Sequence, residues 1–205
     1  MRWPRIVALA AVLAGAVAGA AVPLRDGDIV FQTSRSSQSL AIQRATHSPW
    51  SHIGIVLFRD GQPFVYEAIA TVRYTPLDSW TARGDGGRYV VKRLKSPLDA
   101  WQAAKLRAAA QPFEGRPYDS WFEWSNQRIY CSELVWKMYH DALGIDLGAL
   151  QKLRDFDLAD PAVRAKMQQR YGDRVPLDEP VISPARVFSS PLLIDIKLPP
   201  VKLPK

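Results

Sequence analysis

Residues 51–69, SHIGIVLFRDGQPFVYEAI, decide how the chain folds. Two runs of β-branched and aromatic residues flank Asp60-Gly61, and this arrangement is a strong signal for a β-hairpin with a two-residue turn. In such a hairpin Arg59 pairs with Gln62, and this pairing sets the register of both strands. The sequence therefore predicts an antiparallel ribbon over these residues.

The predicted register brings two ionisable side chains together. His52 lies opposite Ile69 and Gly54 lies opposite Glu67, and because side chains alternate, all four share one face of the ribbon. Glu67 is then a diagonal neighbour of His52, about 7 Å away between backbones and within reach of a glutamate side chain. Gly54 has no side chain to block that reach, so Glu67 is expected to orient the imidazole. A loop of odd length would instead put Glu67 on the wrong face.

Residues 127–144, QRIYCSELVWKMYHDALG, contain the only cysteine of the chain, Cys131. The spacing predicts a helix that starts near Cys131 and ends near Gly144, with the cysteine facing inward like the apolar stripe. One interpretation is a buried core cysteine. The other is a nucleophile, because the N-terminal end of a helix dipole favours a thiolate.

The rest of the chain places strands before helices, which indicates an α+β fold with an antiparallel sheet. Further strands are expected at Asp28–Gln32, 71–77, 87–94 and 192–196. Further helices are expected after a serine cap at Ser36 or Ser37, after a Ser96 cap with Pro97 in the first turn, and within Asp160–Tyr171.

Residues 1–20 have the order of a secretory signal peptide: two arginines, an uncharged apolar run and Ala18-Gly19-Ala20. Export to the periplasm or the medium is therefore expected, and a retained N-terminal membrane anchor is the alternative. Residues 21–196 then form one domain without stable membrane insertion, and residues 197–205 form a proline-rich tail.

The charge and the metal-binding residue types exclude several functional classes. The formal charge is +7, and removal of Arg2 and Arg5 would lower it to about +5, which suits anionic surroundings such as a cell envelope. No basic stripe indicates nucleic-acid binding. Three histidines and one cysteine without metal-ligand spacing argue against a metal site, and an exported lone cysteine cannot form an internal disulfide.

The other histidines and serines near the key residues are weaker candidates. His47 lies in a Ser/Pro loop and His140 lies two turns along the helix from Cys131, so both are expected to be structural or surface residues. Ser51 and Ser132 neighbour His52 and Cys131, but a serine nucleophile would leave the cysteine unexplained.

Four segments in order, LRDGDIVFQT, SHIGIVLF, FVYEA and YCSELVW, resemble the YiiX/YebB-like family. This resemblance implies an exported, circularly permuted papain-like fold, related to the NlpC-type cell-wall peptidases, in which the histidine strand precedes the cysteine helix. It implies Cys131 as the nucleophile, His52 as the general base and Glu67 as the third member. Tyr130, and Tyr118 in the family-like loop PFEGRPYDSWF, are candidates for oxyanion or substrate contacts.

The resemblance implies a cofactor-free cysteine amidase or peptidase that acts on envelope material such as peptidoglycan peptides. A lipid acyltransferase or acyl hydrolase of the lecithin:retinol acyltransferase type is the first alternative, because it shares the permuted order. A ligand-binding module without turnover is the second. Five aromatic residues before the cysteine line an acyl groove or belong to the core: Phe113, Tyr118, Trp121, Phe122 and Trp124.

Overall fold

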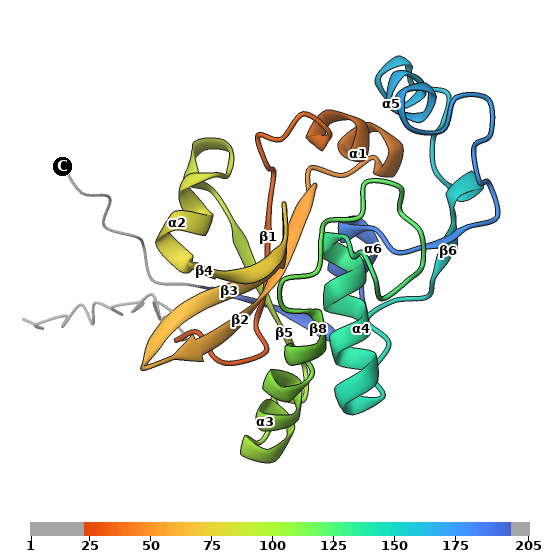
Figure 1. The fold of residues 1–205 in the computed structure, drawn as a ribbon. Helices are drawn as coiled ribbons and strands as arrows, with labels where there is room; N and C mark the ends of the chain where they lie inside the picture. Colours follow the sequence, from red (N-terminus) through yellow and green to blue (C-terminus); the bar gives the residue numbers. More distant parts are fainter. Residues whose placement is uncertain (1–22, 198–205) are drawn as a thin grey trace, which may run out of the picture.

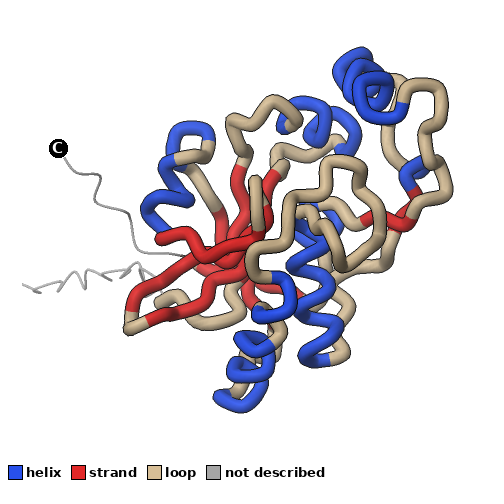
Figure 2. The backbone as a smooth tube through the Cα atoms, in the orientation of Figure 1, coloured by secondary structure: helices blue, strands red, loops and turns tan. Residues whose placement is uncertain are grey.

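A six-stranded antiparallel sheet forms the centre of the computed structural model, which describes residues 23–197 (Figures 1 and 2). The predicted signal peptide, and the predicted tail after residue 197, lie outside the described residues. The strand order is β4-β3-β2-β1-β5-β8, and the predicted α+β class is confirmed. The strands are β1 (Ile29–Gln32), β2 (His52–Arg59), β3 (Gln62–Ala68), β4 (Val72–Pro76), β5 (Val90–Leu94) and β8 (Leu193–Ile196).

The predicted hairpin is confirmed with its register. β2 and β3 pair from Arg59 opposite Gln62 to Ile55 opposite Tyr66. The turn residues Asp60 and Gly61 have φ values of 49° and 73°, as a two-residue turn that follows the twist of the strands requires. At Gly54 a Cβ would lie 2.9 Å from the carbonyl oxygen of Tyr66, so only glycine fits there without a shift of the backbone.

Helices cover both faces of the sheet. α4 (Cys131–Leu143) and α3 (Ala100–Ala108) pack together on one face, over the main apolar core that includes Ile53, Ile55 and Leu134. α2 (Leu77–Ala82) lies against β3 and β4, and its Trp80 belongs to a second apolar cluster on the other face. α4 ends at Gly144, whose φ of 66° provides the predicted left-handed C-cap.

A smaller layer beside the N-terminal end of α4 consists of short elements. α1 (Ser39–Thr46) packs against α5 (Pro161–Tyr171), and a two-stranded sheet of β6 and β7 lies near them (Figure 1). The remaining elements are β6 (Gln151–Lys152), β7 (Pro180–Val181), α6 (Pro184–Phe188) and the 3₁₀ turns η1 (Asp85–Gly87), η2 (Gln111–Phe113) and η3 (Leu153–Asp155). Within residues 23–197 no helix has the length and apolar character needed to cross a membrane.

Two predicted helix starts are wrong. α1 begins after Gln38, which caps it without a side-chain hydrogen bond, rather than after Ser36 or Ser37. α3 begins after Asp99, not at the predicted Ser96 cap with Pro97 in its first turn. Asp99 and Gln102 cap the helix reciprocally, which satisfies more backbone donors than a lone serine can.

Candidate active site

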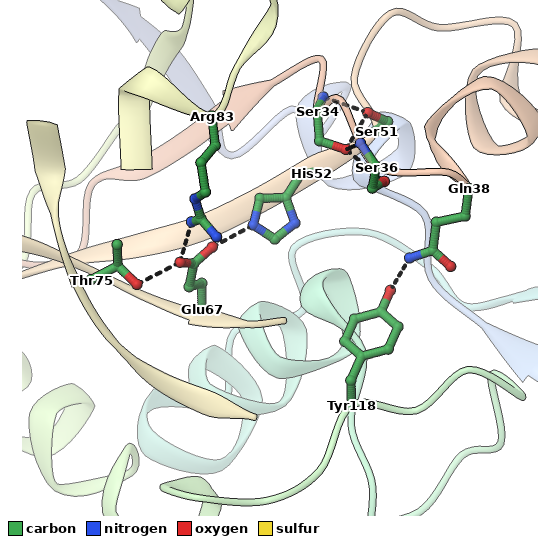
Figure 3. Close-up of polar contacts among 9 residues, drawn as sticks. All are labelled: Ser34, Ser36, Gln38, Ser51, His52, Glu67, Thr75, Arg83 and Tyr118. Atoms are coloured by element: carbon green, nitrogen blue, oxygen red, sulfur yellow. Dashed lines mark hydrogen bonds and ion pairs between the residues drawn. The ribbon is translucent and has the colours of Figure 1, made fainter. Parts of the chain in front are cut away.

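His52 and Glu67 form a buried hydrogen-bonded pair at the open end of the hairpin (Figure 3). His52 Nε2 lies 2.6 Å from Glu67 Oε2, and the glutamate is fully buried. Because the carboxylate binds Nε2, the second ring nitrogen, Nδ1, is left for another partner. The diagonal contact expected from the register is therefore present.

The other oxygen of Glu67 is held by two donors from neighbouring elements. Thr75 Oγ1, on β4, donates to Oε1 at 2.6 Å, and Arg83, directly after α2, donates to the same oxygen (Figure 3). Burial alone would raise the pKa of Glu67, but His52, Thr75 and Arg83 together hold that pKa below its ordinary value. Glu67 is thus an ionised carboxylate with a fixed orientation.

Interactions with Cys131 and Glu67 set the charge of His52. Burial alone would lower the pKa of this imidazole, but its side-chain interactions with Cys131 and then Glu67 raise the pKa to about 9. The ring also stacks on Trp80 of α2, with centroids 6.1 Å apart. At neutral pH His52 is therefore an imidazolium between a carboxylate and the cysteine.

Cys131 is the first residue of α4 and is only 3% exposed. It is not enclosed by solid packing, because it lines a cavity of about 80 Å³ between α4, α1 and α5. The thiol therefore belongs to the buried layer and also borders this cavity, and it interacts with His52.

A second cavity lies on the histidine side. It has a volume of about 500 Å³ and is lined by His52, Ser51, Arg35 and Arg83 among others. The cavity at Cys131 is lined mainly by apolar side chains, among them Ala41, Ala45 and Val163. The two cavities share Gln38 and Tyr118 in their walls, so these residues lie between the two sides of the site.

The two candidate tyrosines have different surroundings. The Tyr118 hydroxyl accepts a hydrogen bond from Gln38 Nε2 at 2.7 Å (Figure 3). Tyr130 lines the cavity at Cys131, but it is buried, its ring packs edge-on against Phe122, and its hydroxyl accepts from the Ile182 amide at 3.0 Å. The Tyr130 side chain thus holds the loop at Ile182 in place, which is a packing role.

The weaker candidates lie in structural positions. His47 and His140 are exposed and lie near Asp157 and Asp146, respectively. The Ser51 hydroxyl joins a serine network with Ser39, and Ser132 donates to the Ile182 carbonyl. Of the five aromatics, only Tyr118 and Phe122 line the cavity at Cys131; Phe113 is in the core, Trp121 is largely exposed and Trp124 packs on Trp136.

Three residues that complete the surroundings of His52 and Glu67 were not predicted: Thr75, Trp80 and Arg83. Thr75 lies in a correctly predicted strand, and its pairing with Val65 would have placed it near Glu67. Trp80 and Arg83 depend on α2, which has six residues and a weak sequence signal.

The site does not have the donor set of a metal centre. Among residues 23–197, no three His, Cys, Asp or Glu side chains are grouped to hold a metal ion. Both oxygens of Glu67 already accept hydrogen bonds from the protein, Oε1 from Thr75 and Arg83 and Oε2 from His52.

Comparisons of the sequence and of the structure with known proteins agree on the same family. Residues 23–196 match a family described as permuted papain-like amidase enzymes, YaeF/YiiX, C92 family. The chain is 51% identical over 170 residues to the uncharacterised protein YiiX of Escherichia coli strain K12. The aligned residues make up 83% of this chain and 84% of that protein. It is similar to a crystal structure described as the metalloprotein yiiX of Escherichia coli O157:H7, with a TM-score of 0.82, 50% identity, and coverage of 85% of this chain and 98% of that one.

Proposed function

Because the chain belongs to the YaeF/YiiX family of permuted papain-like amidases, we propose that it hydrolyses an amide bond through an acyl-enzyme on Cys131. The observation that carries this proposal is the buried hydrogen bond between Glu67 and His52, together with the interaction of His52 with the cysteine that begins α4. An activated cysteine needs an adjacent base, and that base needs a group that orients it. In this proposal Cys131, His52 and Glu67 supply these three parts.

In the proposed mechanism the Cys131 thiolate attacks the substrate carbonyl, and the carbonyl oxygen becomes an oxyanion. His52 donates its Nδ1 proton to the amine as the C–N bond breaks, and the thioester remains on Cys131. Water then attacks the thioester while His52 takes a proton from it, which releases the carboxylic acid and restores the thiolate–imidazolium pair. Glu67 stays ionised and stabilises the imidazolium throughout.

The pH dependence of catalysis follows from the raised pKa of His52. The leaving amine needs the protonated imidazole, and the pKa of that group is about 9 in the folded protein. We expect kcat/KM to stay level from neutral pH upward and to fall tenfold per pH unit above about pH 9. The measurement is a kcat/KM profile from pH 6 to 11. An alkaline limb centred near the ordinary imidazole pKa, about 6.5, would contradict the assignment.

The envelope is the proposed place of action. Support comes from the signal-like N-terminal sequence and from the net charge of about +5 that remains after removal of Arg2 and Arg5, which suits anionic surroundings. Peptidoglycan peptides contain amide bonds in that compartment, so they are the first substrate class to test.

The apolar cavity favours a second candidate, a substrate with a fatty acyl group. In the proposed reaction the acyl part stays on Cys131, and the cavity beside this residue is lined mostly by apolar side chains, whereas Arg35 and Arg83 line the histidine side. An acyl chain would therefore lie between α1 and α5, and the amine or alcohol would lie near His52. Hydrolysis or acyl transfer from a lipid amide or ester fits this division.

Filling the cavity separates the two substrate classes. Ala45, on α1, lines the apolar cavity, and Ala45→Phe is expected to lower the rate of Cys131 acylation by a long-chain N-acyl amide about tenfold or more, because a bulky ring takes the space of the chain. Acylation by muropeptides should change little. Intact-protein mass spectrometry of both reactions gives the rates and identifies the acyl group.

The matched control is Ala104→Phe, which adds the same ring to an exposed position of α3. It should leave both rates unchanged. If Ala45→Phe slows the two substrates equally, the cavity does not hold the acyl chain. If neither substrate class acylates the wild-type protein, neither class is the substrate.

A further inference from the structure

Three side chains from distant parts of the sequence form a hydrogen-bonded series that ends between the two cavities. Arg170 Nη2, on α5, donates to Gln38 Oε1 at 2.6 Å. Gln38 Nε2, at the N-cap of α1, donates to the Tyr118 hydroxyl at 2.7 Å (Figure 3). The series therefore connects the outer helix α5 to the wall shared by the Cys131 and His52 cavities.

The chemistry of the three groups fixes the direction of both hydrogen bonds. A guanidinium can only donate, so it holds the amide oxygen of Gln38 on the side of Arg170. The amide NH₂ must then face Tyr118, and because an NH₂ group only donates, the phenol oxygen is the acceptor. The proton of the Tyr118 hydroxyl is thereby kept free of Gln38 and available to another acceptor.

The surroundings of Tyr118 indicate where that proton is used. Tyr118 and Cys131 line the same cavity, and burial, followed by the electrostatic interaction with Cys131, raises the pKa of Tyr118. The phenol thus stays protonated at any pH at which the protein would work. A neutral donor beside the nucleophile is suited to a negative charge that develops on the substrate.

We propose that Arg170 and Gln38 are positioning residues that hold the Tyr118 proton toward the oxyanion formed when Cys131 attacks the substrate. This inference rests on the proposed function, because it needs an acyl transfer to Cys131. Tyr118 is the group that touches the reacting oxygen, and the other two act through it. Arg170 also keeps Gln38 from rotating into the opposite, unproductive orientation.

Gln38→Glu tests the direction of the series with almost no change in shape. A carboxylate still accepts from Arg170, and indeed pairs with it more strongly, but it turns Tyr118 from an acceptor into a donor. The Tyr118 hydroxyl then donates its proton to residue 38 and can no longer donate it to the oxyanion. Acylation of Cys131 by p-nitrophenyl acetate, followed by intact-protein mass spectrometry, should slow about 10²-fold, as for loss of one oxyanion donor, while the melting temperature is kept.

Two comparisons separate this role from a structural one. Alkylation by iodoacetamide passes through no oxyanion, so its rate in Gln38→Glu should stay close to wild type. In a Tyr118→Phe background, Gln38→Glu should cause no further loss of acylation, because no phenol proton remains to be redirected. Gln169→Glu adds the same charge to an exposed position of α5, and it should leave the rate of acylation unchanged.

If the wild type is acylated at Cys131 and Gln38→Glu is acylated at the same rate, the inference is overturned and the proposed function still stands. Equal loss of acylation and alkylation would overturn it as well, since the effect would then act on the thiol. Absence of any acyl adduct on Cys131 in the wild type would overturn the proposed function and the inference together.

Discussion

Cys131→Ala is expected to reduce amide hydrolysis by about 10⁴-fold or more, because the residue that would form the acyl-enzyme is lost. The exchange removes one small atom beside a cavity, so the fold should be retained, with a loss of stability of about 1 kcal/mol or less. Product formation with the substrate identified by adduct analysis gives the first quantity, and chemical denaturation followed by circular dichroism gives the second.

The same variant has a second expected effect, on His52. Interaction with Cys131 helps to raise the pKa of this imidazole to about 9, so the pKa should fall when the sulfur is removed. NMR titration of His52 measures the shift. Cys131→Ala with more than about 1% of wild-type activity would contradict the mechanism. Stoichiometric ligand binding by Cys131→Ser as tight as in wild type, with turnover in neither, would instead identify a ligand-binding module.

Glu67→Gln is expected to lower kcat/KM by about 10³- to 10⁴-fold through the tautomer of His52. Thr75 and Arg83 both donate to Oε1, so the amide oxygen of the glutamine will take that position. The NH₂ group then faces His52 Nε2 and donates to it, which puts the proton of the neutral ring on Nδ1. That nitrogen can no longer take a proton from the thiol. The imidazolium is also destabilised, because its Nε2–H group would face the NH₂ group of the glutamine, and both are donors.

Thr75→Val provides the control for Glu67→Gln. It removes one donor to Glu67 without changing the group that faces His52, so the loss of kcat/KM should be a few-fold, about the effect of one hydrogen bond. The ¹⁵N shifts of His52 report the tautomer directly. Glu67→Gln with activity within tenfold of wild type, or with Nε2 still protonated, would show that Glu67 does not orient the ring.

The parts of the site that could be predicted from the sequence depend on local rules. The Asp60-Gly61 turn fixes the register of β2 and β3, and the register alone places Glu67 beside His52, 15 residues apart in the chain. The start of α4 at Cys131 and its end at Gly144 follow from helix spacing and a glycine C-cap. The order of strands and helices gave the α+β class.

The parts that could not be predicted depend on contacts between distant segments. Gln38 bonds to Tyr118 and Arg170 across 80 and 132 residues, and no spacing rule connects such positions. Arg83 reaches Glu67 only because α2 folds back over the sheet, and that helix is too short to show a period. At α3, reciprocal capping by Asp99 and Gln102 outcompeted the Ser96-Pro97 signal, which is a competition between two local rules.

The wall of Gln38 and Tyr118 between the two cavities has a kinetic consequence. A substrate bound across it has its two halves in separate compartments, so the amine can diffuse away while the acyl half is still covalently held. The amine is then released before the acyl group, and the cavity that it leaves can admit either water or a second amine. The proposed acyl-enzyme mechanism therefore predicts ping-pong kinetics, in which added amines compete with water for the acyl group in proportion to their concentration.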